Sequence, residues 1–64
     1  MKYKKLKMLL LEEKISQSKL ARFLGISEKS LSLKMNGKID FWLHEVIQIC
    51  SILKIENPKE LFFI

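Results

Sequence analysis

Few side chains in this sequence could perform catalysis. The 64 residues include one histidine, His44, one cysteine, Cys50, and one aspartate, Asp40. They offer no nucleophile–base pair and no His/Cys cluster with metal-ligand spacing. The chain does offer twelve lysines and arginines, which suit recognition of a polyanion. We therefore expect neither an enzyme nor a cofactor or metal site, with His44 at the surface and Cys50 in the core as a small hydrophobe.

The basic residues are concentrated in the first part of the chain. Residues 1–38 hold ten lysines and arginines against three acidic residues, a net charge of +7, whereas residues 39–64 hold two against four, a net charge of −2. Such asymmetry is expected of a polyanion-binding face, although it could also serve solubility alone.

The sequence predicts neither a membrane span nor a disulfide. No unbroken apolar run exceeds the four residues of 8–11, which is too few to span a membrane. A single cysteine fits a reducing compartment. We expect a cytoplasmic protein.

Residues 16–37 are the segment that positions polar side chains at the surface. Gly25 stands where a helix would end in a left-handed residue, Ile26 is an apolar plug, and Ser27 can cap a second helix. Two helices joined by a glycine turn predict a helix-turn-helix. Their apolar stripes at helical spacing are Leu20, Ala21 and Leu24 in the first helix and Leu31 and Met35 in the second, which Asn36 and Gly37 then end.

This segment resembles the phage repressor and Cro-type helix-turn-helix family, and the similarity extends more weakly over the whole chain. The resemblance implies an all-α fold, a compact five-helix DNA-binding domain that occupies residues 1–64 as a single domain. Family members often carry a polar or ionic pair between the first helix and the end of the reading helix. Leu10 and Met35 stand there in this chain, so we expect a plain apolar contact. The residues that carry the resemblance are Ser16, Gln17, Leu20, Ala21, Leu24, Gly25, Ile26, Ser27, Leu31, Asn36, Gly37 and Lys38.

Three further helices are predicted around this motif. The first covers residues 2–13, where Leu6, Leu9 and Leu10 form a stripe and Met8 and Leu11 fall off it. The fourth covers residues 43–53 and is apolar on most sides, which is typical of a central helix, so we expect it in the middle of the core.

The start of the fourth helix departs from the family pattern. Trp42 stands where the family often has serine or threonine as the cap, so Asp40 is the candidate substitute. Trp42 could cover the core, face the DNA backbone or join a dimer interface, and we favour core cover. We expect Phe41 to pack beneath the start of this helix. A short fifth helix is predicted from Pro58 to about Phe62, because an asparagine cap precedes a proline at the first helical position.

The outward face of the second motif helix is the candidate reading surface, because the N-terminal part of this helix enters the major groove in helix-turn-helix proteins. Lysine can donate to guanine O6 and N7, glutamate can accept from cytosine N4, and an apolar side chain suits a thymine methyl. The candidate base-contacting residues are Glu28, Lys29, Ser32 and Leu33. The alternatives for Leu33 are packing on Ile39 or simple exposure to solvent. The polar Lys34 at a commonly apolar position suggests a slightly rotated helix.

Contacts to phosphates would set the register of this helix without reading the sequence. Gln17 starts the first motif helix, where free amides and the helix dipole attract an anion. The resembling family uses the segment after the reading helix on the DNA backbone. The candidate backbone-contacting residues are Gln17, Lys19, Ser30, Asn36, Gly37 and Lys38, with Lys34 as a weaker candidate.

The predicted function is that of a phage or prophage transcriptional regulator that binds a double-stranded DNA operator. A monomer of this size reads too few base pairs for a genome-sized search, so we expect a homodimer on half-sites about 34 Å apart. The expected dimer interface is Ile55, Pro58, Phe62, Phe63 and Ile64.

We expect no small-molecule substrate and no membrane partner. A membrane-surface helix over residues 2–14 is disfavoured because Glu12 and Glu13 oppose anionic lipid. The alternative function is a protein-interaction module of the anti-repressor or antitoxin type.

Overall fold

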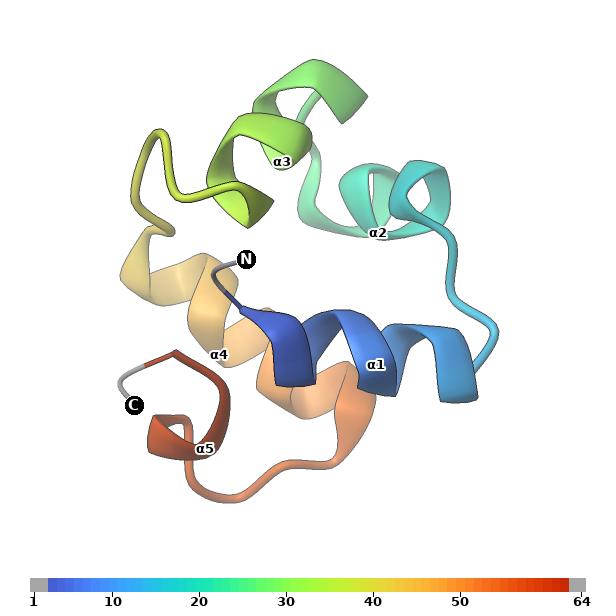
Figure 1. Cartoon of the computed structure of the whole chain (residues 1–64), viewed down its shortest axis with the longest axis vertical. Coiled ribbons are helices and arrows are strands. Elements are labelled where there is room, and N and C mark those ends of the chain that lie inside the picture. The colour runs from blue at the N-terminus through green and yellow to red at the C-terminus, as the bar shows by residue number, and fades with distance from the viewer. Residues whose placement is uncertain (1–2, 63–64) are drawn as a thin grey trace.

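Five helices follow one another in the computed structural model, which describes residues 3–62 (Figure 1). No strand occurs in that range, so the fold is all-α, as predicted. The described chain is nearly isometric, with extents of 26 × 23 × 22 Å. The helices are α1 (Lys4–Glu12), α2 (Gln17–Leu24), α3 (Glu28–Met35), α4 (Leu43–Leu53) and α5 (Lys59–Phe62).

Short polar side chains determine where three of the helices begin. The Ser16 hydroxyl accepts from the Lys19 amide at 3.1 Å, and the Ser27 hydroxyl accepts from the Ser30 amide at 3.0 Å. The Asn57 side chain accepts from the amide of Lys59 at 3.1 Å. Each bond satisfies an amide that has no partner within its helix. The caps predicted for α3 and α5 are confirmed, and Ser16 caps α2 in the same way.

Four helices are followed by a residue in the left-handed conformation, and only two of these residues are glycines. Gly25 has φ 74° and Gly37 has φ 78°, as their predicted turn roles require, whereas Lys14 and Lys54 both have φ 58°. After each one, an amide reaches back five residues to a helical carbonyl, as Ile55 does to Cys50 at 2.8 Å. These are Schellman endings. The two lysines adopt them at a cost of about 1–2 kcal/mol each, because their Cβ crowds the backbone.

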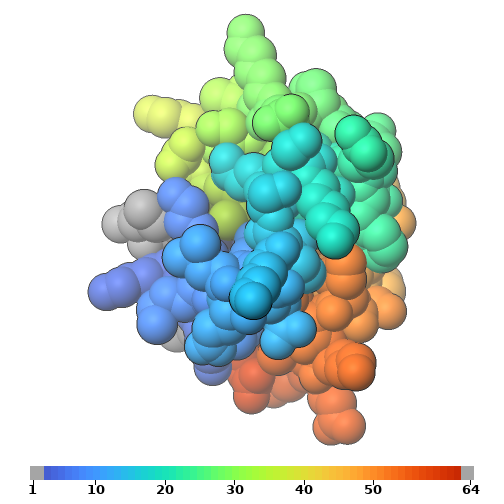
Figure 2. All heavy atoms as spheres, turned by 90° about the vertical axis from the view of Figure 1, so that its right-hand side faces the viewer, coloured from blue at the N-terminus to red at the C-terminus, as the bar shows by residue number. Residues whose placement is uncertain are grey.

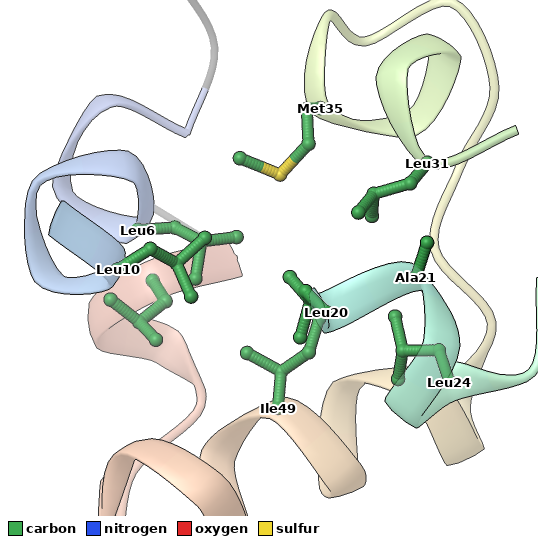
Figure 3. Packing of buried hydrophobic residues seen from close by; sticks show 9 residues of the cluster. Leu6, Leu10, Leu20, Ala21, Leu24, Leu31, Met35 and Ile49 are labelled. Carbon is green, nitrogen blue, oxygen red and sulfur yellow. The ribbon is translucent and has the colours of Figure 1, made fainter. Parts of the chain in front are cut away.

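All five helices contribute to one buried cluster (Figure 3). Met35 points from the end of α3 toward Leu6 and Leu10 of α1, in line with the apolar junction expected there (Figure 3). No side chain of this cluster is more than 7% exposed. Its members are Leu6, Leu10, Leu20, Ala21, Leu24, Leu31, Met35, Ile49 and Leu61.

Three aromatic rings close one side of the core, where the two ends of the described chain meet. The centroid of Phe41 lies 5.2 Å from that of Tyr3 and 5.2 Å from that of Phe62, in edge-to-face arrangements. The Tyr3 and Phe62 centroids are 5.7 Å apart. Such pairs add about 0.5–1.5 kcal/mol beyond the area they bury. The rings therefore tie the segment before α4 to both ends of the chain.

α4 buries one face only, and the expectation of a central helix was wrong. Val46, Ile49 and Cys50 are buried, the last of them as predicted. Burial raises the pKa of the Cys50 thiol. Leu43 and Ile47, however, are 73% and 58% exposed. A chain of this length buries only about 60% of its unfolded surface, so four short helices cannot surround a fifth. α4 lies at the edge of the core with an apolar flank uncovered.

Candidate nucleic-acid interface

α2 and α3 make up one end of the molecule, the upper end in both Figure 1 and Figure 2. The turn between them follows Gly25, and the two helices contact each other directly. The small Ala21 faces Leu31 across their junction (Figure 3). Both are at most 2% exposed, so a close helix approach holds the back of α3 against the core. Helix, glycine turn and capped helix therefore form the helix-turn-helix that the sequence predicts.

The four candidate base-contacting residues lie along the side of α3 that does not face the core. Glu28 and Lys29 are exposed in its first turn, and Ser32 is half-buried. Leu33 remains 38% exposed although it is apolar. Glu28 is also well placed electrostatically, because a carboxylate is favoured near the positive end of a helix dipole. This surface thus presents an acid, an ammonium, a hydroxyl and an apolar group.

The candidate phosphate-contacting residues fall into two groups. Lys19, Asn36 and Lys38 are exposed, while Gln17, Ser30 and Gly37 are half-buried. The side-chain amide of Asn36 already donates to the backbone carbonyl of Ser32 at 2.9 Å. The Ser30 hydroxyl accepts from the Ser27 hydroxyl at 3.0 Å. Asn36 and Ser30 therefore also stabilise the two ends of α3, whereas the two lysines are exposed at the surface.

Lys34 differs sharply from its expected role as a weaker phosphate contact. It is 5% exposed, and its ammonium lies 2.5 and 2.6 Å from the two carboxylate oxygens of Glu45. Glu45 is itself 2% exposed. This buried ion pair joins the last turn of α3 to the first turn of α4. The suggestion that Lys34 contacts phosphate was wrong, because its charge is neutralised internally. Leu31 and Met35 are both buried beside it.

Opposing effects act on the Glu45 carboxyl. Burial by itself would raise its pKa, but hydrogen bonds from Lys34 and from the Trp42 backbone amide outweigh it. The charges of Lys34 and His44 act in the same lowering direction, so the pKa lies below its usual 4.5. Glu45 is therefore a carboxylate at neutral pH. Its ion pair with Lys34 has no net charge, so the surrounding core does not have to stabilise an unpaired charge.

Trp42 occupies the cap position of α4 but does not cover the core as expected. Its ring is 67% exposed, with its centroid 5.9 Å from the Lys34 ammonium and 5.8 Å from the His44 ring. Asp40 is not the cap residue either. The Glu45 side chain reaches back to accept from the Trp42 amide at 2.8 Å, so one carboxylate serves both the helix start and the ion pair. A backbone fixed in this way holds the indole outward.

A sequence signal for the ion pair existed. Lys34 is three residues after the inward Leu31, and Glu45 precedes Val46 and lies four residues before Ile49. Helical spacing therefore places both charges beside core positions. Two opposite charges that both face a core are expected to pair, because neither is stable there alone.

A family model matches residues 1–64, the whole chain, and carries the description "Protein of unknown function (DUF739)". The chain belongs to this family. Searches of curated proteins and of solved structures found no match. The function of this DUF739 member therefore has to be argued from its own residues.

The residues predicted for a dimer interface have mixed surroundings. Ile55 and Pro58 are half-buried, and Phe62 packs against Tyr3 and Phe41 within the chain. The last two members of the set, Phe63 and Ile64, lie outside the described residues. That interface stays a prediction.

The described chain has neither a metal-ligand cluster nor a membrane-spanning helix. Among residues 3–62, no group of three or more His, Cys, Asp and Glu side chains could hold a metal ion. No helix in the same range is long and apolar enough to cross a membrane. His44 is exposed, as predicted.

Proposed function

We propose that this chain binds double-stranded DNA sequence-specifically through the outward side of α3. It would act as a phage repressor or Cro-type transcriptional regulator, as a dimer on an operator, in the cytoplasm of a bacterial host. The observation that carries the proposal is the contrast between the two sides of α3. Leu31, Lys34 and Met35 are all buried, while Glu28 and Lys29 are exposed on the first turn.

This contrast suits the major groove, which admits one helix and is read by side chains near its N-terminus. Lys29 would donate to guanine, Glu28 would accept from cytosine, and Leu33 would contact a thymine methyl. Ser32, half-buried beside them, would add contact without strong discrimination. Discrimination also requires a helix that cannot shift. The Lys34–Glu45 pair supports this, because it fixes the last turn of α3 to α4.

The distribution of charge supports the same surface. Residues 1–38, which include α2 and α3, have a net charge of +7. Lys34 is neutralised by Glu45, so the exposed cations of the motif and its following turn are Lys19, Arg22, Lys29 and Lys38. Of these, Lys19, Lys29 and Lys38 would replace counterions on the phosphates. Binding should therefore weaken steeply as salt concentration rises.

The test is selection of bound duplexes from a random pool, followed by titration of the selected site with three lysine variants. Lys29→Ala should lose about 1–3 kcal/mol on that site, mostly through lost discrimination at one base pair. Lys38→Ala should weaken binding to all sequences alike and reduce the salt slope by about one unit or less. The matched control is Lys59→Ala, an exposed lysine of α5, which should change neither quantity.

Two results would refute the proposal. The first is that selection yields no preferred motif. The second is that Lys29→Ala behaves like Lys59→Ala on every duplex. A protein-interaction module is the second candidate function, favoured by the exposed apolar residues at the start of α4. It would show no salt-dependent binding to DNA.

A further inference from the structure

The first turn and a half of α4 exposes three large apolar side chains. Trp42, Leu43 and Ile47 are 67%, 73% and 58% exposed. They fall within six consecutive residues, about 9 Å of helix. Together they leave on the order of 400 Å² of mostly apolar surface uncovered, and exposed apolar surface of this size is often functional. This end of α4 follows the loop after α3, at the left edge of Figure 1.

We call Trp42, Leu43 and Ile47 the α4 surface. The charge around it indicates which partner it would accept. Residues 1–38 have a net charge of +7, so a twofold contact through that basic region would be repulsive. The α4 surface lies outside it. Lys34 beneath Trp42 is neutralised by Glu45, and the nearest preceding charges, Lys38 and Asp40, are opposite in sign. A twofold contact brings a surface against itself, so an apolar patch without net charge is what such a contact requires.

We propose that two copies of this chain associate through the α4 surface, about a twofold axis that places Trp42, Leu43 and Ile47 of each copy against those of the other. This inference rests on the dimeric regulator proposed above and names the surface by which it would pair. The C-terminal residues predicted from the sequence are the competing surface. Phe62, one of them, already packs against Tyr3 and Phe41 within its own chain.

The size of the α4 surface sets the expected strength of the dimer. Two such patches bury on the order of 800 Å² of apolar area, which is below the 1,200–2,000 Å² or so of a standard stable interface. The free protein should therefore be a weak dimer. Adjacent half-sites on DNA would raise the effective concentration of one copy near the other and complete the pairing there.

Trp42 is the only tryptophan of the chain, so its fluorescence reports directly on the α4 surface. The experiment follows its emission and its quenching by acrylamide together with sedimentation equilibrium, without DNA, from about 1 µM to about 1 mM protein, a range that spans weak association. We expect emission to shift to the blue and quenching to fall as the sedimenting mass rises toward two chains. Because no DNA is present, failure of the DNA-binding proposal leaves this result unaffected.

Two exposed-site variants provide the contrast. Ile47→Lys should weaken self-association at least tenfold, since it places two ammonium groups at the contact, and Leu43→Lys should do the same. The matched control is Leu11→Lys, which changes an equally exposed leucine of α1 (76%) and should leave association unchanged. Circular dichroism should show that each variant keeps its helix content.

Four outcomes would overturn the inference. The wild-type chain could stay monomeric over the whole range, or Ile47→Lys could dimerise as the wild type does. Removal of residues 63 and 64 could abolish a dimer that Ile47→Lys leaves intact, which would assign the contact to the C-terminus. Finally, Trp42 could become shielded only when DNA is added, at one chain per duplex, which would make the α4 surface a DNA contact.

Discussion

Removing either partner of the Lys34–Glu45 pair should destabilise the domain far more than removing both. Lys34→Met keeps the length of the side chain but leaves a buried carboxylate with the Trp42 amide as its remaining hydrogen-bond donor. Glu45→Gln keeps an acceptor for that amide but leaves a buried ammonium. The double variant removes both charges and retains the acceptor. It should regain most of the stability that each single variant loses.

The geometry gives the magnitude. At the observed 2.5 Å separation and an effective dielectric constant of about 20, the attraction is about 6–7 kcal/mol. Desolvation of the two ions offsets most of it, so the intact pair contributes little net stability, yet loss of one partner typically costs about 3–5 kcal/mol. A chain of 64 residues has only about 3–10 kcal/mol of stability in total. Each single variant should therefore lose between about a third and all of the stability of the domain at 25 °C.

The assay is urea denaturation of the wild type, the two single variants and the double variant at several pH values. It measures the free energy of unfolding of each protein and how that free energy depends on pH. The pKa of Glu45 is lowered in the folded wild type. Its contribution is therefore present above the usual 4.5 and should be lost as pH falls below that value. In Lys34→Met, burial acts without the ammonium and should raise that pKa, so stability should instead decline as pH rises. Equal and additive losses in the cycle, or the same pH slope in Lys34→Met as in the wild type, would refute this account.

Three further predictions concern the helix ends and the reading surface. Lys54→Gly should stabilise the domain by up to about 1 kcal/mol in urea denaturation, because glycine adopts the left-handed conformation at φ 58° without crowding; an unchanged midpoint would contradict it. Gly25→Ala should destabilise it by about 1–2 kcal/mol, although the added methyl would meet no atom within 4 Å, because the cost arises from φ alone; a neutral result would show that this turn can relax. Replacing thymine with uracil, one position at a time in a selected operator, should weaken wild-type binding at one position per half-site and leave Leu33→Ala insensitive there. Unchanged affinity at every thymine would remove the groove contact of Leu33.

The parts of this fold that were predictable from sequence depend on short-range chemistry. Ser16, Ser27 and Asn57 accept hydrogen bonds from amides two or three residues later, so their roles are visible in a few neighbouring letters. Gly25 and Gly37 mark left-handed turns for a similarly local reason. The lysine turns at 14 and 54 were not predicted, because no residue type there signals them. Helix packing imposes those conformations on residues that do not prefer them.

The ion pair and the exposed start of α4 were not predicted, although helical spacing places Lys34 and Glu45 beside core positions. The two residues are eleven positions apart and on different helices, so their contact also depends on how α3 and α4 are oriented. The sequence shows that Leu43 and Ile47 are apolar, but it does not show whether other helices cover them. A domain this small can bury only part of its apolar side chains, and the remaining ones lie on the surface.

These two features lie at the same junction. Glu45 holds Lys34 on its inner side, and its backbone partner Trp42 begins the apolar surface on the outer side. The last turn of α3 and the proposed contact between copies are therefore joined by one carboxylate. If two copies pair through α4, the separation of their reading helices depends on this rigid junction, and half-sites about 34 Å apart leave little tolerance for error. An apolar pair could fill the same space but would leave the helices free to slide, whereas bonds of 2.5 and 2.6 Å from one ammonium to both carboxylate oxygens fix their relative position.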